Sequence, residues 1–323
     1  MDSTLECYTN GIDTDDMPNK HLDHLEDLVF FGRREVTNAV NEVMNNPKLS
    51  VKWDGAPAIV FGTDPRNGKF FVGTKSVFNK IKVKICYDQT DIDTHYKGCL
   101  ADILRLCLHH LPRIGGIVQA DFIGVSGGMV YRPNILEYRF DQKTYGRIVL
   151  AAHTAYTEIS PDAIGYGGIN IYGEDSCQFL GSNEADAHIT KLPDFNWIKL
   201  LLRLARCKIP SAKTRPHILK HINSFIRAGR IPRPQEMYDS LDAKYKCEVN
   251  VTTFKVWYML FQLKERLLEN IKVTGSVSCY IDGEPTEHEG FVTVAEHPVK
   301  IVDRLTFSKA NFNLKNNWTN EKL

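Results

Sequence analysis

The segment Ser50–Gly62 constrains the fold of this chain most, because it places a lysine between two β-prone runs. A short apolar run leads into Lys52, Asp54 and Gly55 follow at once, and a second apolar run begins at Ala58. A lysine at the end of a buried strand is costly unless a charged partner or a lowered pKa compensates. Either condition suits an amine that acts as a nucleophile. The structural alternative is a strand-end ion pair between Lys52 and Asp54 beside a turn glycine.

The periodicity of apolar residues predicts a β-rich body interrupted by helices. A helical pattern over 20–46 contains a candidate break at Gly32. Strands are expected over 48–76, with an Asn67–Gly68 hairpin turn. Further strands are predicted over 116–123, 147–152, 275–282 and 290–302, and further helices over 98–111, 195–206, 217–227 and 253–271. We therefore predict a mixed α+β fold with a helical insertion.

This pattern divides the chain into four parts. Residues 1–47 form an N-terminal arm and helical region, 48–190 the first part of a core, 191–272 a basic helical insertion, and 273–323 the second part of the core. The acidic N-terminus lacks a secretion signal, and no stretch approaches the roughly 18 apolar residues of a membrane span. The eight cysteines form no C-x-x-C pair, which favours reduced thiols. We expect a cytoplasmic, monomeric protein without membrane contact.

Several later segments extend the pattern that the lysine begins. In chain order they are Val72–Ser76 (VGTKS), Ile117–Phe122 (IVQADF), Ile148–Thr154 (IVLAAHT), Glu289–Val292 (EGFV) and Val299–Val302 (VKIV). With Lys-Trp-Asp-Gly at 52–55, they resemble the ordered motifs of the covalent nucleotidyltransferase superfamily, which holds the ATP-dependent DNA and RNA ligases and the mRNA capping enzymes. His24–Asp27 (HLED) adds a closer resemblance to a bacteriophage group of these proteins.

The resemblance implies roles for the residues at the motif positions. Lys52 is the implied nucleophile, which forms a lysyl-AMP intermediate from ATP. The implied nucleotide-binding residues are Asp54, Gly55, Lys75, Asp121, His153, Glu289 and Lys300, and the implied Mg²⁺ ligands among them are Asp54, Asp121 and Glu289. Two of these positions have structural alternatives. Asp121 would be a strand-end cap, and His153 a satisfied core histidine.

The chemistry explains why these residue types are needed. An amine that attacks the α-phosphorus of ATP must be deprotonated near neutral pH, so we expect Lys300, a metal and desolvation to lower the pKa of Lys52. Charge on the phosphoryl oxygens and on the leaving pyrophosphate calls for Mg²⁺ and for lysines directed at that charge.

The chain also departs from the family pattern. Pro57 stands where many DNA ligases and capping enzymes carry arginine, an absence that several RNA ligases share. The last motif has Lys300 followed by Val302 instead of two lysines. The sequence after Lys300 is too short for the oligonucleotide-binding barrel that most ligases add there.

The helical block carries a separate electrostatic signal. Residues 191–235 contain eleven lysines and arginines but one acidic residue, Asp194, a pattern typical of phosphate-backbone binding. The candidate nucleic-acid-binding residues are Arg203, Arg206, Lys208, Lys213, Arg215, Arg227 and Arg230. The alternative is a solvated basic face.

Together these observations predict an ATP-dependent polynucleotide ligase that uses Mg²⁺ and seals nicks between a 5′-phosphate and a 3′-hydroxyl. Nicked duplex DNA is the favoured partner, because a basic block suits a duplex backbone. An RNA ligase is the alternative that Pro57 favours. A catalytically silent nucleic-acid-binding relative is the alternative that the single lysine of the last motif favours.

Overall fold

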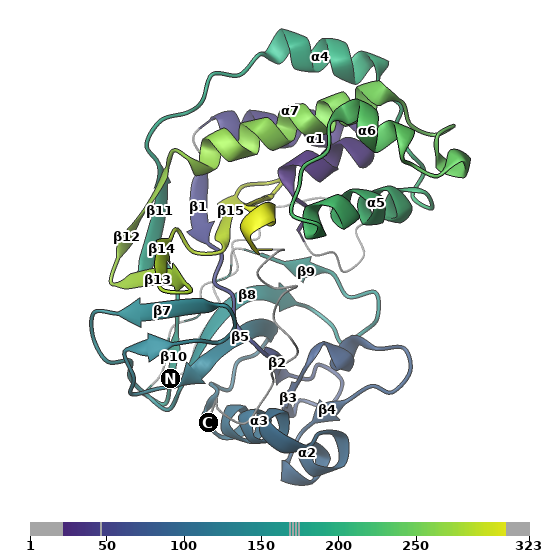
Figure 1. Cartoon of the computed structure of the whole chain (residues 1–323). Coiled ribbons are helices and arrows are strands. Elements are labelled where there is room, and N and C mark those ends of the chain that lie inside the picture. Colours follow the sequence, from purple (N-terminus) through teal and green to yellow (C-terminus); the bar gives the residue numbers. More distant parts are fainter. Residues whose placement is uncertain are drawn as a thin grey trace.

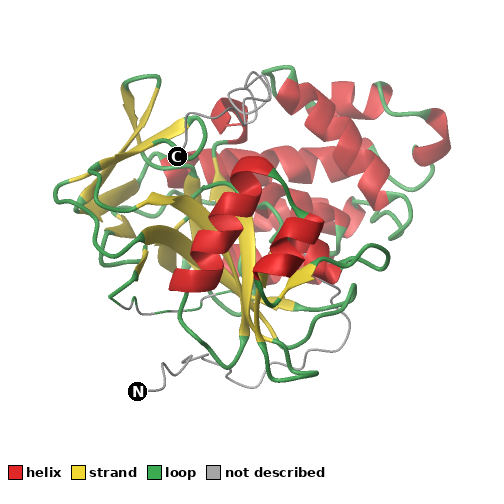
Figure 2. Cartoon of the chain, turned by 90° about the horizontal axis from the view of Figure 1, so that it is seen from below, coloured by secondary structure: helices red, strands yellow, loops and turns green. Residues whose placement is uncertain are grey.

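The computed structural model describes residues 22–45, 47–167, 169, 171, 173 and 175–307. Helices gather at one end of the molecule, strands fill the middle, and two further helices lie at the other end (Figure 1). The second view shows the same separation of a helical group from a strand-rich group (Figure 2). The protein has a mixed α+β fold with mostly antiparallel sheets, as the sequence predicts.

The helical end combines the N-terminal region with the block that follows residue 196. Its elements are the 3₁₀ helix η1 (Leu25–Phe30), α1 (Arg33–Met44), α4 (Trp197–Arg206), α5 (Arg215–Arg227), α6 (Pro234–Asp239), η3 (Ala243–Tyr245) and α7 (Val251–Leu268). Gly32 separates η1 from α1, so the predicted break is confirmed. α7 lies at the centre of the group with Phe254 and Trp257 fully buried, and Phe30 of η1 packs edge-on against Phe254. The block therefore shares one apolar core with the N-terminal helices.

The largest sheet is organised around the hairpin that the Asn67–Gly68 turn predicts. Its strands run in the order β10 (Cys177–Phe179), β8 (Ile148–Tyr156), β5 (Ile117–Val125), β2 (Ala58–Thr63), β3 (Phe70–Gly73) and β4 (Ile85–Cys86), with β9 (Gly165–Tyr166) on β8. Only the β8–β10 pair is parallel. Helix α3 (Gly98–His110) contributes Leu104 and Cys107 to a core shared with Ile59 of β2. The short helices η2 (Lys75–Phe78) and α2 (Gln89–His95) flank β4 in the chain.

Three smaller sheets connect the large sheet with the helices. They are β1 (Lys48–Val51) with β15 (Gly290–Val294) and β16 (Lys300–Val302); β14 (Glu284–Thr286), β13 (Val277–Ile281), β7 (Leu136–Phe140) and β6 (Val130–Tyr131); and β11 (Ala185–Ile189) with β12 (Ile271–Gly275). The strand predicted over 290–302 is thus a hairpin of two strands. These sheets contribute to the core of the helical end, as do Ile123, Val149 and Ala151 of the large sheet. The large sheet also has a core of its own with α3.

The lysine segment crosses from one sheet to another. β1 belongs to the three-stranded sheet and β2 to the large sheet, so residues 52–57 span the junction between them. None of the helices within the described ranges has the length and apolar character needed to span a bilayer.

Candidate active site

Backbone hydrogen bonds fix the lysine segment between two strands. The Lys52 N–H donates to the Gly290 carbonyl at 2.8 Å, which holds the end of β1 against β15. The Ala56 N–H donates to the Phe122 carbonyl at 3.0 Å, and the Phe122 N–H donates to the Pro57 carbonyl at 3.0 Å. The segment therefore has a defined path at the sheet junction.

Two glycines allow this close approach. A Cβ on Gly55 would lie 2.6 Å from the Phe122 carbonyl oxygen, which is shorter than any van der Waals contact. Gly290 has a φ of +149°, and a Cβ there would lie 2.6 Å from the Ile301 carbonyl oxygen. The glycines of the Lys-Trp-Asp-Gly and Glu-Gly motifs thus have a backbone role, because L side chains rarely adopt such a conformation or fit such a gap.

The junction gathers the charged residues that the sequence singles out. The Lys52 ammonium forms an ion pair with Glu289 and lies 3.7 Å from the Asp54 carboxylate. Lys52 and Asp54 come from the crossing segment after β1, and Glu289 directly precedes β15. The side chains of Lys52 and Asp54 are each 23% exposed and that of Glu289 is 12% exposed, so the cluster is partly buried and still reaches solvent.

The pKa of Lys52 differs from the prediction. Burial lowers this pKa, but the negative charges of Glu289 and Asp54 outweigh burial, and the net pKa is above its ordinary value. The expectation of a lowered pKa is therefore wrong for this arrangement. The sequence indicated that Lys300 lies near Lys52. It did not show that the carboxylates of Glu289 and Asp54 are in direct contact with the Lys52 ammonium.

The other groups of the cluster also have shifted pKa values. Burial, assisted by the charge of Asp54, raises the pKa of Glu289 to about 7, although Lys52 opposes the shift. Burial and the charge of Asp121 raise the pKa of Asp54. Burial, assisted by the charge of Lys52, lowers the pKa of Lys300, and burial lowers that of Lys75. Several carboxylates thus compete for one lysine.

Asp121 and His153 lie on neighbouring strands of the large sheet. Asp121 lies within β5, opposite Ala58 and Ala151, so the strand-end cap is the wrong alternative. The His153 Nε2 atom lies 3.5 Å from the Asp121 carboxylate, and the His153 side chain is 39% exposed. The core-histidine alternative is therefore also wrong, and His153 presents its ring at the surface beside an acidic group.

The structure adds three residues that sequence reasoning missed. The Tyr138 hydroxyl accepts a hydrogen bond from the Asp54 N–H at 2.9 Å and donates to the Asp54 carbonyl at 3.1 Å. The Asn134 side-chain amide donates to the Asp54 carboxylate at 2.5 Å. His288 packs edge-on against Trp53 with 5.0 Å between ring centroids, and burial lowers its pKa to about 4. No local pattern marks these residues, because β7 and the turn before Glu289 approach the segment only in the fold.

The donors at the junction suit a hard cation. Asp54, Asp121 and Glu289 supply carboxylate oxygens, the ligands that Mg²⁺ prefers. The raised pKa values of Glu289 and Asp54 reflect burial and the proximity of other carboxylates, which a divalent cation would relieve. The donor types therefore suit the expected metal, but these three carboxylates are not among the described groups that lie close enough together to hold an ion. Their assignment as Mg²⁺ ligands stays a prediction.

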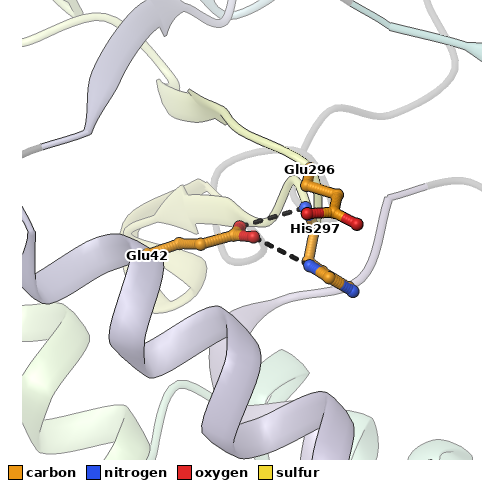
Figure 3. A group of neighbouring side chains, drawn as sticks. All are labelled: Glu42, Glu296 and His297. Atoms are coloured by element: carbon orange, nitrogen blue, oxygen red, sulfur yellow. Dashed lines mark hydrogen bonds and ion pairs between the residues drawn. The ribbon is translucent and has the colours of Figure 1, made fainter. Parts of the chain in front are cut away.

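A second group of metal-ligand residue types lies elsewhere, at the turn of the β15–β16 hairpin. Figure 3 shows Glu42 of α1 reaching His297, with Glu296 beside them. Glu42 accepts hydrogen bonds from the His297 N–H at 3.0 Å and from His297 Nδ1 at 2.8 Å. These hydrogen bonds connect α1 to the β15–β16 hairpin and account for the proximity of Glu42 and His297.

The predicted nucleic-acid-binding residues lie on α4, on α5 and in the segments that follow these two helices. Arg203 and Arg206 lie on α4, and Arg203 donates to the Lys255 carbonyl of α7. Lys208 donates to the Cys247 carbonyl, and Lys213 is exposed. Arg215 donates to the Phe30 carbonyl and stacks on the Phe31 ring, contacts that tie α5 to η1.

The remaining two basic residues lie at the end of α5. Arg227 is exposed at the last residue of the helix. Arg230 is exposed just beyond it, and it forms an ion pair with Glu236 and stacks on Phe225. Arg215 and Arg230 are thus held by contacts within the protein, whereas the role of the basic residues in nucleic-acid binding stays a prediction.

Comparison with known proteins gives one match. No curated protein and no solved structure matches the chain. A model of the family of unknown function DUF6267 matches residues 19–316. That range contains every charged residue of the sheet junction, and the chain belongs to the DUF6267 family.

Proposed function

We propose that the chain is a covalent nucleotidyltransferase, and specifically an ATP-dependent polynucleotide ligase that acts through lysyl-AMP at Lys52. The observation that carries the proposal is the clustering of Lys52, Asp54 and Glu289 at one sheet junction. Asp121, Lys75 and Lys300 act on the same cluster electrostatically. These residues come from separate parts of the chain, and each stands at a motif position of the superfamily that the sequence resembles.

The proposed reaction has three steps. The Lys52 amine attacks the α-phosphorus of ATP, a P–N bond forms, and pyrophosphate leaves. A 5′-phosphate oxygen of the nucleic acid then attacks the same phosphorus, which releases Lys52 and joins AMP to the strand end. Finally, a 3′-hydroxyl attacks the 5′-phosphorus, and AMP leaves as the backbone closes.

Residues of the cluster have separate tasks in these steps. Glu289, adjacent to Lys52 and with a pKa near 7, is placed to accept the proton that the ammonium must lose before attack. Lys300 and Lys75 would balance charge on the phosphates. Mg²⁺ bound by Asp54, Asp121 and Glu289 would screen phosphate charge and weaken the hold of the carboxylates on the lysine. Tyr138 and Asn134 orient Asp54.

The DNA or RNA strand would run past this junction. α5 lies next to the segment after β16, because Arg304 donates to Asn223 of α5 at 2.6 Å. The exposed Arg227 at the end of α5 is therefore a candidate contact to the nucleic-acid backbone. DNA is the favoured substrate and RNA is the alternative. Sealing assays on nicked DNA and nicked RNA duplexes would distinguish the two.

One observation favours a second candidate, a silent relative that binds nucleic acid without forming an adduct. The raised pKa keeps Lys52 protonated, and a protonated amine cannot attack phosphorus. The two candidates differ in whether AMP becomes attached to the protein.

The deciding experiment is intact-protein mass spectrometry after incubation with ATP and Mg²⁺. The native protein is expected to gain one AMP, and Lys52→Ala to gain none. Lys199→Ala, which removes an exposed lysine on α4, is the matched control and should gain AMP as the native protein does. The absence of any adduct on the native protein, with no adduct present before incubation and none from other nucleotides, would leave the silent relative.

A further inference from the structure

Helix α4 presents an apolar surface that the rest of the described chain leaves uncovered. Its Leu200 and Leu204 side chains are buried, and these residues lie one turn apart on one face. Ile198, Leu201 and Leu202 lie on the adjacent face and are 73%, 52% and 55% exposed. The apolar stripe of α4 is therefore wider than the part that packs inside the protein.

Basic residues border this exposed stripe. Lys199, Arg203 and Arg206 recur at three-to-four spacing, so they form a row beside Ile198 and Leu202. Together with Asn196, these five residues line an open hollow of about 500 Å³. The lining contains no carboxylate within the described chain, so the hollow combines apolar and positive character.

This combination selects one kind of occupant. A second copy of the chain would bring the same row of basic residues against itself, and α4 has no acidic residue to offset them. A nucleic-acid backbone would satisfy the basic row but leave the three apolar side chains in water. A partner with an apolar row and a parallel acidic row satisfies both.

We propose that this face of α4, made of Ile198, Lys199, Leu201, Leu202, Arg203 and Arg206, docks an acidic amphipathic helix of another protein. Apolar side chains of the partner pack on Ile198, Leu201 and Leu202, and one of them enters the hollow. Its carboxylates pair with Lys199 and Arg206, which are both exposed. The inference is independent of the chemistry at Lys52, because α4 packs on α7 at the helical end, away from the sheet junction (Figure 1).

The test uses the full-length protein and a synthetic, helix-stabilised peptide with fluorescein at one end. The peptide carries leucines at i, i+3, i+4 and i+7 and glutamates on the flanking positions. A second peptide has the same composition in scrambled order, and a third has lysine in place of each glutamate. Fluorescence anisotropy is expected to show that the native protein binds the ordered acidic peptide about tenfold or more tightly than either control peptide.

Variants separate the apolar from the electrostatic part. Leu202→Ser should weaken binding of the acidic peptide about tenfold, and Val130→Ser, at a 49% exposed apolar residue of β6, should leave it unchanged. The double variant Lys199→Glu with Arg206→Glu should reverse the preference toward the lysine peptide. All three changes are at exposed positions, and thermal unfolding by circular dichroism confirms that each variant is folded.

Several outcomes would overturn the proposal. Equal affinity for the ordered and scrambled peptides would show attraction by charge alone. If the native protein binds duplex DNA and Leu202→Ser does not, the face would be a nucleic-acid site. If the same holds for anionic vesicles, the face would bind a lipid surface. Self-association in sedimentation that Leu202→Ser abolishes would assign it to a second copy.

Discussion

Two clusters of opposite charges in the described chain differ in how completely the charges are paired. In one, Lys264 pairs with Glu26 at 2.9 Å, and both side chains are fully buried. Arg304 pairs with Glu26 at 2.9 Å and with Asp27 at 3.1 Å. In the other, Lys52 contacts Glu289 and Asp54, and these side chains remain partly exposed.

The pKa shifts show what the difference means. Burial favours the neutral form of Glu26, but Lys264 and Arg304 outweigh burial and hold the pKa of Glu26 below its usual range. For Glu289, burial prevails over Lys52 and raises the pKa to about 7. Two cations serve two carboxylates in the first cluster, whereas Lys52 alone lies between Glu289 and Asp54 with Asp121 near. The first arrangement keeps Glu26 ionised inside the core, and the second leaves groups that can exchange protons or bind a cation.

The two clusters also touch the same strand. The Lys300 N–H donates to the Asp23 carbonyl at 2.9 Å, and His24 forms a parallel bridge with Lys300. Glu26 and Asp27 follow directly, and Trp257 of α7 donates to Asp27 at 2.8 Å. The buried cluster thus connects α7 to the strand that carries Lys300 into the sheet junction.

The largest expected effect separates the clusters by stability. Lys264→Met leaves the buried Glu26 carboxylate with one of its two cations, so the free energy of unfolding should fall by about 3–5 kcal/mol. Lys52→Met should change it by about 1 kcal/mol or less, because its partners are partly solvated and can take up protons. Urea denaturation at neutral pH measures both. Losses of equal size would contradict the distinction.

The next effect is a pH dependence of opposite sign for the two glutamates. The pKa of Glu289 rises from 4.5 to about 7 on folding, so the folded state binds more protons than the unfolded state in that window. Its contribution to stability therefore falls as pH rises from 4.5 to 7, by on the order of 1–3 kcal/mol. Glu289→Gln should remove this decline, which unfolding free energies measured across the window would show.

Glu26 is the control for this pH prediction. Its folded pKa lies below 4.5, so its contribution is present above pH 4.5 and is lost as pH falls below that value. The stability difference between the native protein and Glu26→Gln should therefore shrink only under acidic conditions. A Glu289→Gln profile that runs parallel to the native profile from pH 4.5 to 7 would refute the assignment of Glu289.

The last effect concerns Tyr138, whose hydroxyl forms hydrogen bonds with both backbone groups of Asp54. Tyr138→Phe should cost about 1 kcal/mol and slow AMP attachment at Lys52 by roughly threefold to tenfold, because Asp54 is less well oriented. Tyr131→Phe is matched, since Tyr131 is also buried and its hydroxyl forms hydrogen bonds with Thr144 and the Gly128 N–H instead. The rates of AMP attachment are followed by a time course of mass spectra. Equal rates for Tyr138→Phe and Tyr131→Phe would contradict the proposed role of Tyr138 in positioning Asp54.

Much of the fold follows from local pattern. The apolar periodicity predicts the helix over 98–111 and the α5 and α7 helices, and the Asn67–Gly68 turn predicts the β2–β3 hairpin. Local pattern works here because side-chain spacing is set by the period of the element itself. The local pattern predicted one strand over 290–302, but a five-residue turn divides this segment into β15 and β16.

The candidate site was predictable to a different extent. Motif order singled out Lys52, Asp54 and Glu289, which the fold brings into contact. Tyr138 and Asn134 carried no signal in the sequence. Their partner Asp54 lies 84 positions before Tyr138 and 80 positions before Asn134. Spacing along the sequence cannot report such contacts.

The sequence by itself determined which residues carry charge, which segments become helix or strand, and the order in which the candidate motifs occur. Only the tertiary structure decided that the pKa of Lys52 is raised, that Arg203 and Arg206 lie beside exposed leucines, and that Glu26 is buried with Lys264. The physical reason is that secondary structure depends on neighbours within a few residues. Electrostatic shifts and exposed surface instead depend on burial and on distances between segments that meet only when the chain is folded.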